Sequence, residues 1–140
     1  MTERSTLLDT NVVSELLRPH PDAKVVAFVE GLADLRVSAI VFHELALGLS
    51  LMPEGRKKAT LGAGVEAFRL AFEGRIVTVD MSVAAIAGKL RAGEIQAGFE
   101  GDGMDALIGA SAIVSSARLA TRNTKDFVRM GLELVNPWTP

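Results

Sequence analysis

Acidic side chains recur in this 140-residue chain at points that an α/β fold would bring together. Asp9 directly follows an apolar run, in LLDTN, and Glu44 interrupts the apolar stripe of a predicted helix. Asp105 opens the segment DALIGASAIV, and Asp126 ends the segment TRNTKD, with Asn123 three residues before it. A hard divalent cation requires several oxygen ligands that converge on one point. The pattern therefore favours an acidic site for Mg²⁺ or Mn²⁺.

Each of these side chains also has an ordinary structural explanation, which the sequence leaves open. Asp9 is equally well placed to cap the following helix, and Asn123 to cap a short later one. Glu44 would pair with a buried Arg or Lys if no metal is present, because a lone carboxylate among apolar side chains is costly. Asp105 in a first turn can act on the helix dipole alone, although Asp102 is the better candidate for capping there. Only the combination of acids favours the metal site.

The composition excludes several other kinds of site. The chain has no cysteine, which removes disulfides, thiolate metal sites and cysteine nucleophiles together. His43 lies about 100° around its helix from Glu44, and His20 stands between two prolines, so neither histidine is a convincing ligand or base. The segment 101–103 lacks the Lys and the Ser or Thr of a phosphate-binding loop. Zinc does not fit this set of residues.

The charge and hydropathy of the chain restrict its partners. Lys and Arg number 15 and Asp and Glu number 17, for a net charge of -2. Coating duplex DNA requires many phosphate contacts and is not expected of this chain alone, whereas contact with a short stretch of RNA stays open. The mean hydropathy of +0.29 predicts that some apolar surface covers a partner or a second copy. No apolar run of about 18 residues and no signal peptide is found, so no membrane insertion is expected.

The apolar pattern predicts strands that alternate with helices. Strands are expected at 5–8, 35–39, 75–79, 118–121 and 132–135. Helices are expected at 11–18, 22–31, 40–52, 55–72, 82–97, 104–117 and 125–129. Such an alternation forms a mostly parallel sheet covered on both faces, and we expect one α/β domain over residues 1–140. Ligands bind at the carboxyl ends of parallel strands, which is where Asp9 and the segment TRNTKDF fall.

The sequence resembles the PIN-domain family and, within it, the VapC and FitB-like toxins of prokaryotic toxin–antitoxin pairs. The resemblance runs along almost the whole chain, through LLDTNVVSELLRP, SAIVFHELALGL, MDALIGASA and LATRNTKDF, with NPW near the end. It implies an α/β/α sandwich with a mostly parallel sheet and a shared acidic metal site. It further implies a cytoplasmic, dimeric, Mg²⁺- or Mn²⁺-dependent endoribonuclease that a small antitoxin silences.

The resemblance also assigns the acids. Asp9, Glu44 and Asp105 match the three core acids of the family. FitB-like toxins often have Asp where this chain has Asn123, whereas other VapC-like toxins carry Asn there and an acid three residues later, as Asp126 is here. The fourth ligand is therefore either Asp126 or Asn123, and a neutral amide would weaken a second metal site more than the first.

Further residues receive roles from the same resemblance. Asn11 and Thr121 match polar positions that hold the acids in place, and Asn123 supports the site as well. Apart from the resemblance, Arg122 and Lys125 are candidate contacts to the RNA backbone, and the basic run 56–58 is either another such contact or, as we expect, only a solvated first turn of a helix. The implied reaction is hydrolysis of an RNA phosphodiester by metal-activated water, which leaves a 5′-phosphate and a 3′-hydroxyl.

Two other functions compete with this interpretation. In the first alternative, the chain is a catalytically weak partner in a repressor complex in which the antitoxin contacts the DNA. The slightly acidic net charge of the chain is compatible with this division of roles. A phosphoacceptor receiver domain also carries aspartates at strand ends, but it needs paired acids after its first strand, and LLDTN offers one.

We expect the apolar helices of the first half, together with the helix after Ser38, to line an antitoxin groove. Another patch is expected to form a two-fold homodimer, with possible higher-order assembly through the antitoxin. The apolar positions concerned are Val12, Val13, Leu16, Leu17, Val25, Val26 and Phe28.

Overall fold

A five-stranded sheet forms the centre of the structure, a computed structural model that describes residues 4–140. The strands are β1 (Thr6–Leu8), β2 (Leu35–Ser38), β3 (Ile76–Val77), β4 (Arg118–Ala120) and β5 (Leu134–Val135). Their order is β3-β2-β1-β4-β5, and each neighbouring pair is parallel. The strand order reverses beside β1, so the carboxyl ends of β1 and β4 flank the place where ligands bind in open parallel sheets.

Six α-helices and two 3₁₀ turns connect the strands. They are α1 (Thr10–Leu16), α2 (Ala23–Glu30), α3 (Ala39–Leu51), α4 (Arg56–Ala71), α5 (Met81–Gln96), α6 (Gly103–Val114), η1 (Thr124–Asp126) and η2 (Val128–Met130). Side-chain caps begin most of the helices: Asp22 caps α2, Asp80 caps α5 and Asp102 caps α6. The expectation that Asp102 caps α6 is confirmed by the 2.9 Å bond that its carboxylate accepts from the Met104 backbone N–H.

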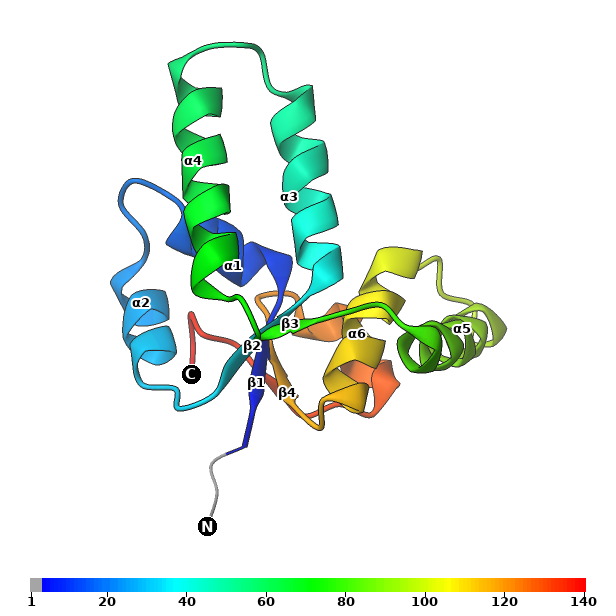
Figure 1. Ribbon diagram of the computed structural model, residues 1–140. Coiled ribbons are helices and arrows are strands. Elements are labelled where there is room, and N and C mark those ends of the chain that lie inside the picture. The colour runs from blue at the N-terminus through cyan, green and yellow to red at the C-terminus, as the bar shows by residue number, and fades with distance from the viewer. Residues whose placement is uncertain (1–3) are drawn as a thin grey trace.

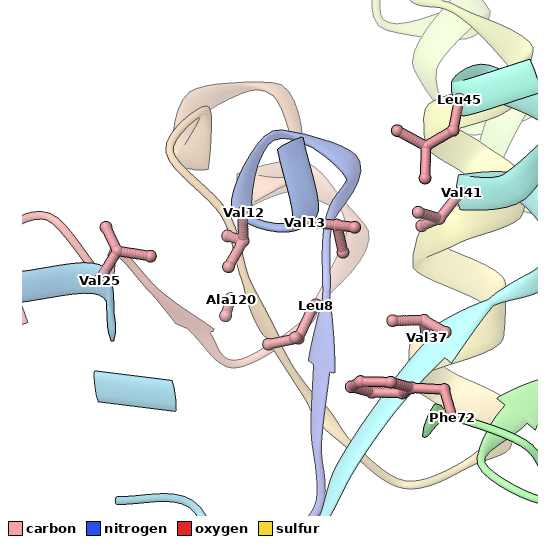
Figure 2. Packing of buried hydrophobic residues seen from close by; sticks show 9 residues of the cluster. All are labelled: Leu8, Val12, Val13, Val25, Val37, Val41, Leu45, Phe72 and Ala120. Atoms are coloured by element: carbon pink, nitrogen blue, oxygen red, sulfur yellow. The ribbon is translucent and has the colours of Figure 1, made fainter. Parts of the chain in front are cut away.

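The helices cover both faces of the sheet, as the sequence predicts for buried parallel strands. Successive strand residues point to opposite faces, so Leu8 packs with α1 and α2, whereas its neighbour Leu7 packs with α6. Figure 2 shows Leu8 on β1 beneath Val12 and Val13 of α1, with Val25 on one side and Val41 on the other, within the first of these clusters. On the other face α5 packs along α6, as Figure 1 shows.

Helices α3 and α4 pack side by side and extend away from the sheet (Figure 1). Only the end of α4 nearest the sheet reaches the core, where Phe68 stacks on Phe72 with ring centres 4.3 Å apart. None of the α4 side chains is fully buried. The far ends of the two helices therefore leave apolar side chains in contact with water.

The observed boundaries differ from the predicted ones in several places. Strand β5 spans two residues instead of 132–135, and α6 ends at Val114 instead of residue 117. Three other differences have a clear physical reason. Strand β3 is a two-residue edge strand instead of 75–79, because it pairs only with β2, which ends at Ser38 to cap α3. The expected helix 125–129 is two 3₁₀ turns that meet at the buried Phe127. Helix α1 begins at Thr10, since Asp9 is its cap. In residues 4–140, no helix combines the length and apolar character needed to cross a membrane.

Candidate active site

A pocket of about 490 Å³ opens at the carboxyl edge of the sheet, where β1 and β4 end. Three of the predicted acids, Asp9, Glu44 and Asp105, line it, although they come from three separate elements. Asn123 lines it as well. The other lining residues are Thr10, Asn11, Ser14, Glu15, Arg18, Arg122 and Trp138.

Asp9 is held more firmly than the other acids. It follows β1 directly, and its backbone N–H donates to Ala120 on β4 at 2.9 Å. One carboxylate oxygen accepts from the Thr10 backbone N–H at 2.8 Å. The other accepts from the Thr121 hydroxyl at 2.7 Å and from the Asn11 amide at 3.2 Å. Asp9 therefore caps α1 and also faces the pocket, so the two interpretations of this residue are compatible.

The electrostatic environment of Asp9 opposes its ionisation. Burial raises the pKa of Asp9 above its usual range, and repulsion from Glu44 and Asp126 raises it further. The bonds from Thr121 and Thr10 lower the pKa and offset part of this effect. The site thus holds the buried Asp9 carboxylate in position although its ionisation is unfavourable, and a nearby cation would stabilise the ionised form.

Glu44 is positioned from α3, which Ser38 caps at the carboxyl end of β2 through a 3.1 Å bond from the Ile40 backbone N–H. The Thr10 hydroxyl donates to Glu44 Oε1 at 2.6 Å, so Thr10 links Glu44 to the start of α1. Within residues 4–140, no Lys or Arg forms an ion pair with this carboxylate. The alternative in which a basic side chain neutralises Glu44 is therefore wrong.

Asp105 is the most perturbed acid of the pocket. It lies half-buried in the first turn of α6. Burial, followed by repulsion from Asp9, Asp102, Asp126 and Glu44, raises the pKa of Asp105 to about 7. A carboxyl group in this state binds a proton or a cation readily near neutral pH.

Asn123 and Asp126 occupy different places relative to the pocket. Asn123 lines it, and its backbone N–H donates to the Thr121 hydroxyl at 3.0 Å. Asp126 is exposed in η1 and does not line the pocket, although its charge raises the pKa values of Asp9 and Asp105. The choice between these two residues as the fourth ligand stays a prediction.

Comparison with known sequences decides the family. The sequence profile of the PIN domain matches residues 6–132. This chain belongs to the PIN domain family. The Toxin FitB of Neisseria gonorrhoeae is 42% identical to this PIN domain over 135 residues, which cover 94% of this chain and 97% of that protein. A VapC ribonuclease of Sinorhizobium fredii is 34% identical over 137 residues, covering 96% and 98%.

A solved structure gives the same result for the fold. FitAB bound to a DNA fragment superposes on this PIN domain with a TM-score of 0.86 at 38% identity, covering 96% of each chain. The predicted family and the predicted α/β fold with a mostly parallel sheet are both confirmed.

The donor atoms of the PIN-domain pocket fit a hard divalent cation by their chemistry. They are carboxylate oxygens from Asp9, Glu44 and Asp105 and an amide oxygen from Asn123. The carboxylates stand apart around the wall, and among residues 4–140 no three Asp, Glu or His side chains gather as a ready ligand set. Burial first, and repulsion between the acids second, raise the pKa values of Asp9 and Asp105, and a bound cation would offset both effects.

The predicted basic residues do not all reach the acids. Arg122 lines the pocket, whereas Lys125 is exposed on η1 outside its wall. Arg56 and Lys57 line a different hollow, and Lys58 pairs with the side chain of Glu54 at 2.7 Å. Both histidines are exposed, in agreement with the sequence analysis.

Several pocket residues were not predicted from the sequence. Thr10 bridges Asp9 and Glu44, through its backbone N–H and its hydroxyl group respectively. Its position directly after Asp9 is the only feature of the sequence that indicates this role. Glu15 and Arg18 follow at helical spacing on the same helix face as Asn11. Trp138 belongs to the motif NPW after the last strand and is the single tryptophan of the chain.

A second, mostly apolar hollow of about 900 Å³ lies between α1, α3 and α4, and we call it the apolar groove. It shares Ser14 and Arg18 with the acidic pocket, so the two hollows adjoin along α1. Its lining residues are Ser14, Leu17, Arg18, Pro19, Leu45, Met52, Arg56, Lys57, Thr60 and Leu61.

Proposed function

We propose that this PIN domain is a Mg²⁺- or Mn²⁺-dependent endoribonuclease that acts as the toxin of a toxin–antitoxin pair. The observation that carries the proposal is that Asp9, Glu44 and Asp105, from three separate elements, line one pocket at the carboxyl edge of the sheet. The family supports it, since relatives that align along nearly the whole chain are named as a toxin and as a ribonuclease.

The residues of the pocket have distinct tasks in this proposal. Thr121 and Asn11 orient the Asp9 carboxylate, and Thr10 orients Glu44, so these acids keep their direction as RNA enters. The cation would be held by Asp9, Glu44 and Asp105, with Asp126 or Asn123 as the fourth ligand. When bound, it supplies positive charge for the phosphodiester and activates the water that attacks phosphorus. Arg122 at the pocket wall contacts the RNA backbone.

The partner we propose is a small antitoxin with an apolar segment, which binds the apolar groove. Half-buried Leu17 and Leu61 line the groove beside the acidic pocket, and Arg56 and Lys57 in its lining favour acidic residues flanking that segment. Because Arg18 lines both hollows, an occupant of the groove reaches the rim of the acidic pocket.

The decisive experiment measures cleavage of a mixed cellular RNA pool by antitoxin-free protein in Mg²⁺, in Mn²⁺ and in EDTA. We expect cutting in both metals, none in EDTA, and a loss of roughly 100-fold or more in Asp9→Asn. Groups that merely orient metal ligands are typically worth about 10- to 100-fold, so a ligand itself is worth at least as much.

The matched control is Asp22→Asn, which alters the cap of α2 outside both hollows and keeps a good capping side chain. It should cut like the wild type. Unchanged cleavage by Asp9→Asn would show that the pocket is not the active site.

A second function has its own supporting observation, because the relative FitAB is bound to DNA in its solved structure. We propose that this chain joins a DNA-binding complex whose antitoxin contacts the DNA. The chain alone should not shift duplex DNA in a gel, whereas the complex with its antitoxin should. Tight DNA binding by the isolated chain would contradict this assignment of roles.

Three further expectations remain proposals: a single domain over residues 1–140, a two-fold homodimer and a cytoplasmic location. The dimer has candidate surface at exposed apolar positions such as Ile95, Ile113 and Val114, away from both hollows. Light scattering at tens of micromolar is the direct measurement of the dimer.

A further inference from the structure

A tight turn brings the single tryptophan of the chain to the acidic pocket. The turn follows β5 and spans residues 136–139, with the Thr139 N–H donating to the Asn136 carbonyl at 3.0 Å. The Asn136 side-chain oxygen accepts a hydrogen bond, at 2.9 Å, from the backbone N–H of Trp138. Pro137 is buried between them and has a restricted φ angle. The indole of Trp138 therefore has a defined position, half-buried against the core and lining the pocket.

The guanidinium of Arg122 lies over this indole, 4.8 Å from the ring centre. The backbone of Arg122 is also anchored, since its N–H donates to the Asn11 side-chain oxygen at 3.2 Å. Although the pocket is acidic, no ion pair joins Arg122 to a carboxylate anywhere in residues 4–140. A cation–π contact attracts the guanidinium without neutralising it, so its charge stays available.

We propose that Trp138 is a positioning residue, which holds the Arg122 guanidinium at the wall of the acidic pocket to receive a phosphate of the RNA chain. The inference rests on the proposed ribonuclease function and adds to it the site where the backbone next to the cut is bound. An RNA phosphate that approaches several carboxylates is repelled, and a free arginine would fold onto one of them. Stacking on Trp138 prevents this collapse and leaves the N–H donors of Arg122 without a carboxylate partner, available for a phosphate.

The test compares steady-state cleavage of a short single-stranded oligoribonucleotide by four variants: Trp138→Leu, Trp138→Phe, Arg122→Gln and the Trp138→Leu/Arg122→Gln double variant. Trp138→Leu keeps an apolar side chain on the core but removes the aromatic face, and it should raise KM about 3- to 10-fold with little change in kcat. Trp138→Phe should restore most of the affinity. Because Trp138 acts through Arg122, the double variant should be no worse than Arg122→Gln alone.

The matched control is Arg129→Gln, since Arg129 also stacks on an aromatic ring, that of Phe99, but outside the pocket. Its KM should equal that of the wild type. A merely structural Trp138 would give additive losses in the double variant and a lower melting temperature, and either an unchanged KM in Trp138→Leu or such additivity overturns the proposal.

Binding without cleavage separates this inference from the proposed function. In EDTA and in the Asp9→Asn background, fluorescence of Trp138 reports the binding of oligouridylate and of an analogue with the same backbone but no bases. Both should bind with similar affinity, and Arg122→Gln should reduce the slope of log affinity against log salt by about 0.7, the value for one phosphate contact on a single strand. A strong preference for the base-bearing oligonucleotide would show that Trp138 stacks on a base instead and would overturn the proposal. Failure of the wild type to cut RNA in metal would remove the ribonuclease function whatever this binding result.

Discussion

The acidic pocket and the apolar groove, which adjoin along α1, each lower the stability of the free protein, but for different physical reasons. Several carboxylates line the acidic pocket, and burial and repulsion raise the pKa values of Asp9 and Asp105. The apolar groove instead leaves side chains such as Leu61 in contact with water. Ser14 and Arg18 border both. A bound cation would stabilise the carboxylates of the pocket, and an apolar partner would cover the side chains of the groove. Each hollow is therefore stabilised by a different kind of ligand.

The largest effect that separates the hollows is expected in the groove. Leu61→Glu places a charge on the apolar wall, where an antitoxin would bury it unpaired, and should weaken antitoxin binding by at least about 100-fold. RNA cleavage by the free protein should remain. Calorimetric titration with the antitoxin measures the first quantity and the cleavage assay the second.

The control for this prediction is Leu70→Glu, because Leu70 lies on the same helix, is 54% exposed and does not line the groove. It should bind the antitoxin like the wild type. Equal loss in both variants would mean that the groove is not the binding surface.

A smaller effect is expected at the fourth position of the acidic pocket. Asp126→Asn removes a full charge that acts on both Asp9 and Asp105, so Mn²⁺ affinity should fall about 10-fold. Asn123→Ala removes only a neutral oxygen and should cost about 3-fold. Titration calorimetry with Mn²⁺ ranks the two, and the reverse ranking would assign the fourth ligand to Asn123. Leu61→Glu should leave the Mn²⁺ affinity unchanged, which keeps the two hollows distinct.

The smallest effect concerns the stability of the metal-free protein. The pKa of Asp105 is about 7 in the folded state against 3.8 as its ordinary value, so the folded protein binds the extra proton between these values. Stability therefore decreases as the pH rises from about 4 to about 7, because this half-buried carboxyl group must ionise in a site that raises its pKa. Asp105→Asn removes this loss, and in EDTA it should raise the melting temperature by a few degrees at pH 8 and hardly at all near pH 4. A melting difference that does not change with pH would contradict the cause given for the raised pKa.

Much of the fold could be predicted because its signals are local. Alternating apolar runs and helix caps such as Asp22 and Asp102 depend on neighbouring residues, and the structure has them where the sequence indicates. The edge strand β3 was overestimated, since its length depends on how far its single partner β2 extends. The segment after Asn123 was expected as one helix, but the burial of Phe127 divides it into two 3₁₀ turns.

The sequence by itself indicated the type of site to look for, because carboxylates in LLDTN, after SAIVFH and in MDALIGASA, without cysteine or a usable histidine, favour a hard cation over zinc or a cysteine nucleophile. Only the tertiary structure decided how those acids are held, because Thr10 reaches Glu44 and Thr121 reaches Asp9 across separations of 34 and 112 residues. The tertiary structure also places Arg56 and Lys57 in the apolar groove instead of the acidic pocket, and it places the Trp138 ring against the Arg122 guanidinium. These contacts join elements that are distant in the chain, and the parallel order of the strands, not local propensity, places their ends at one edge.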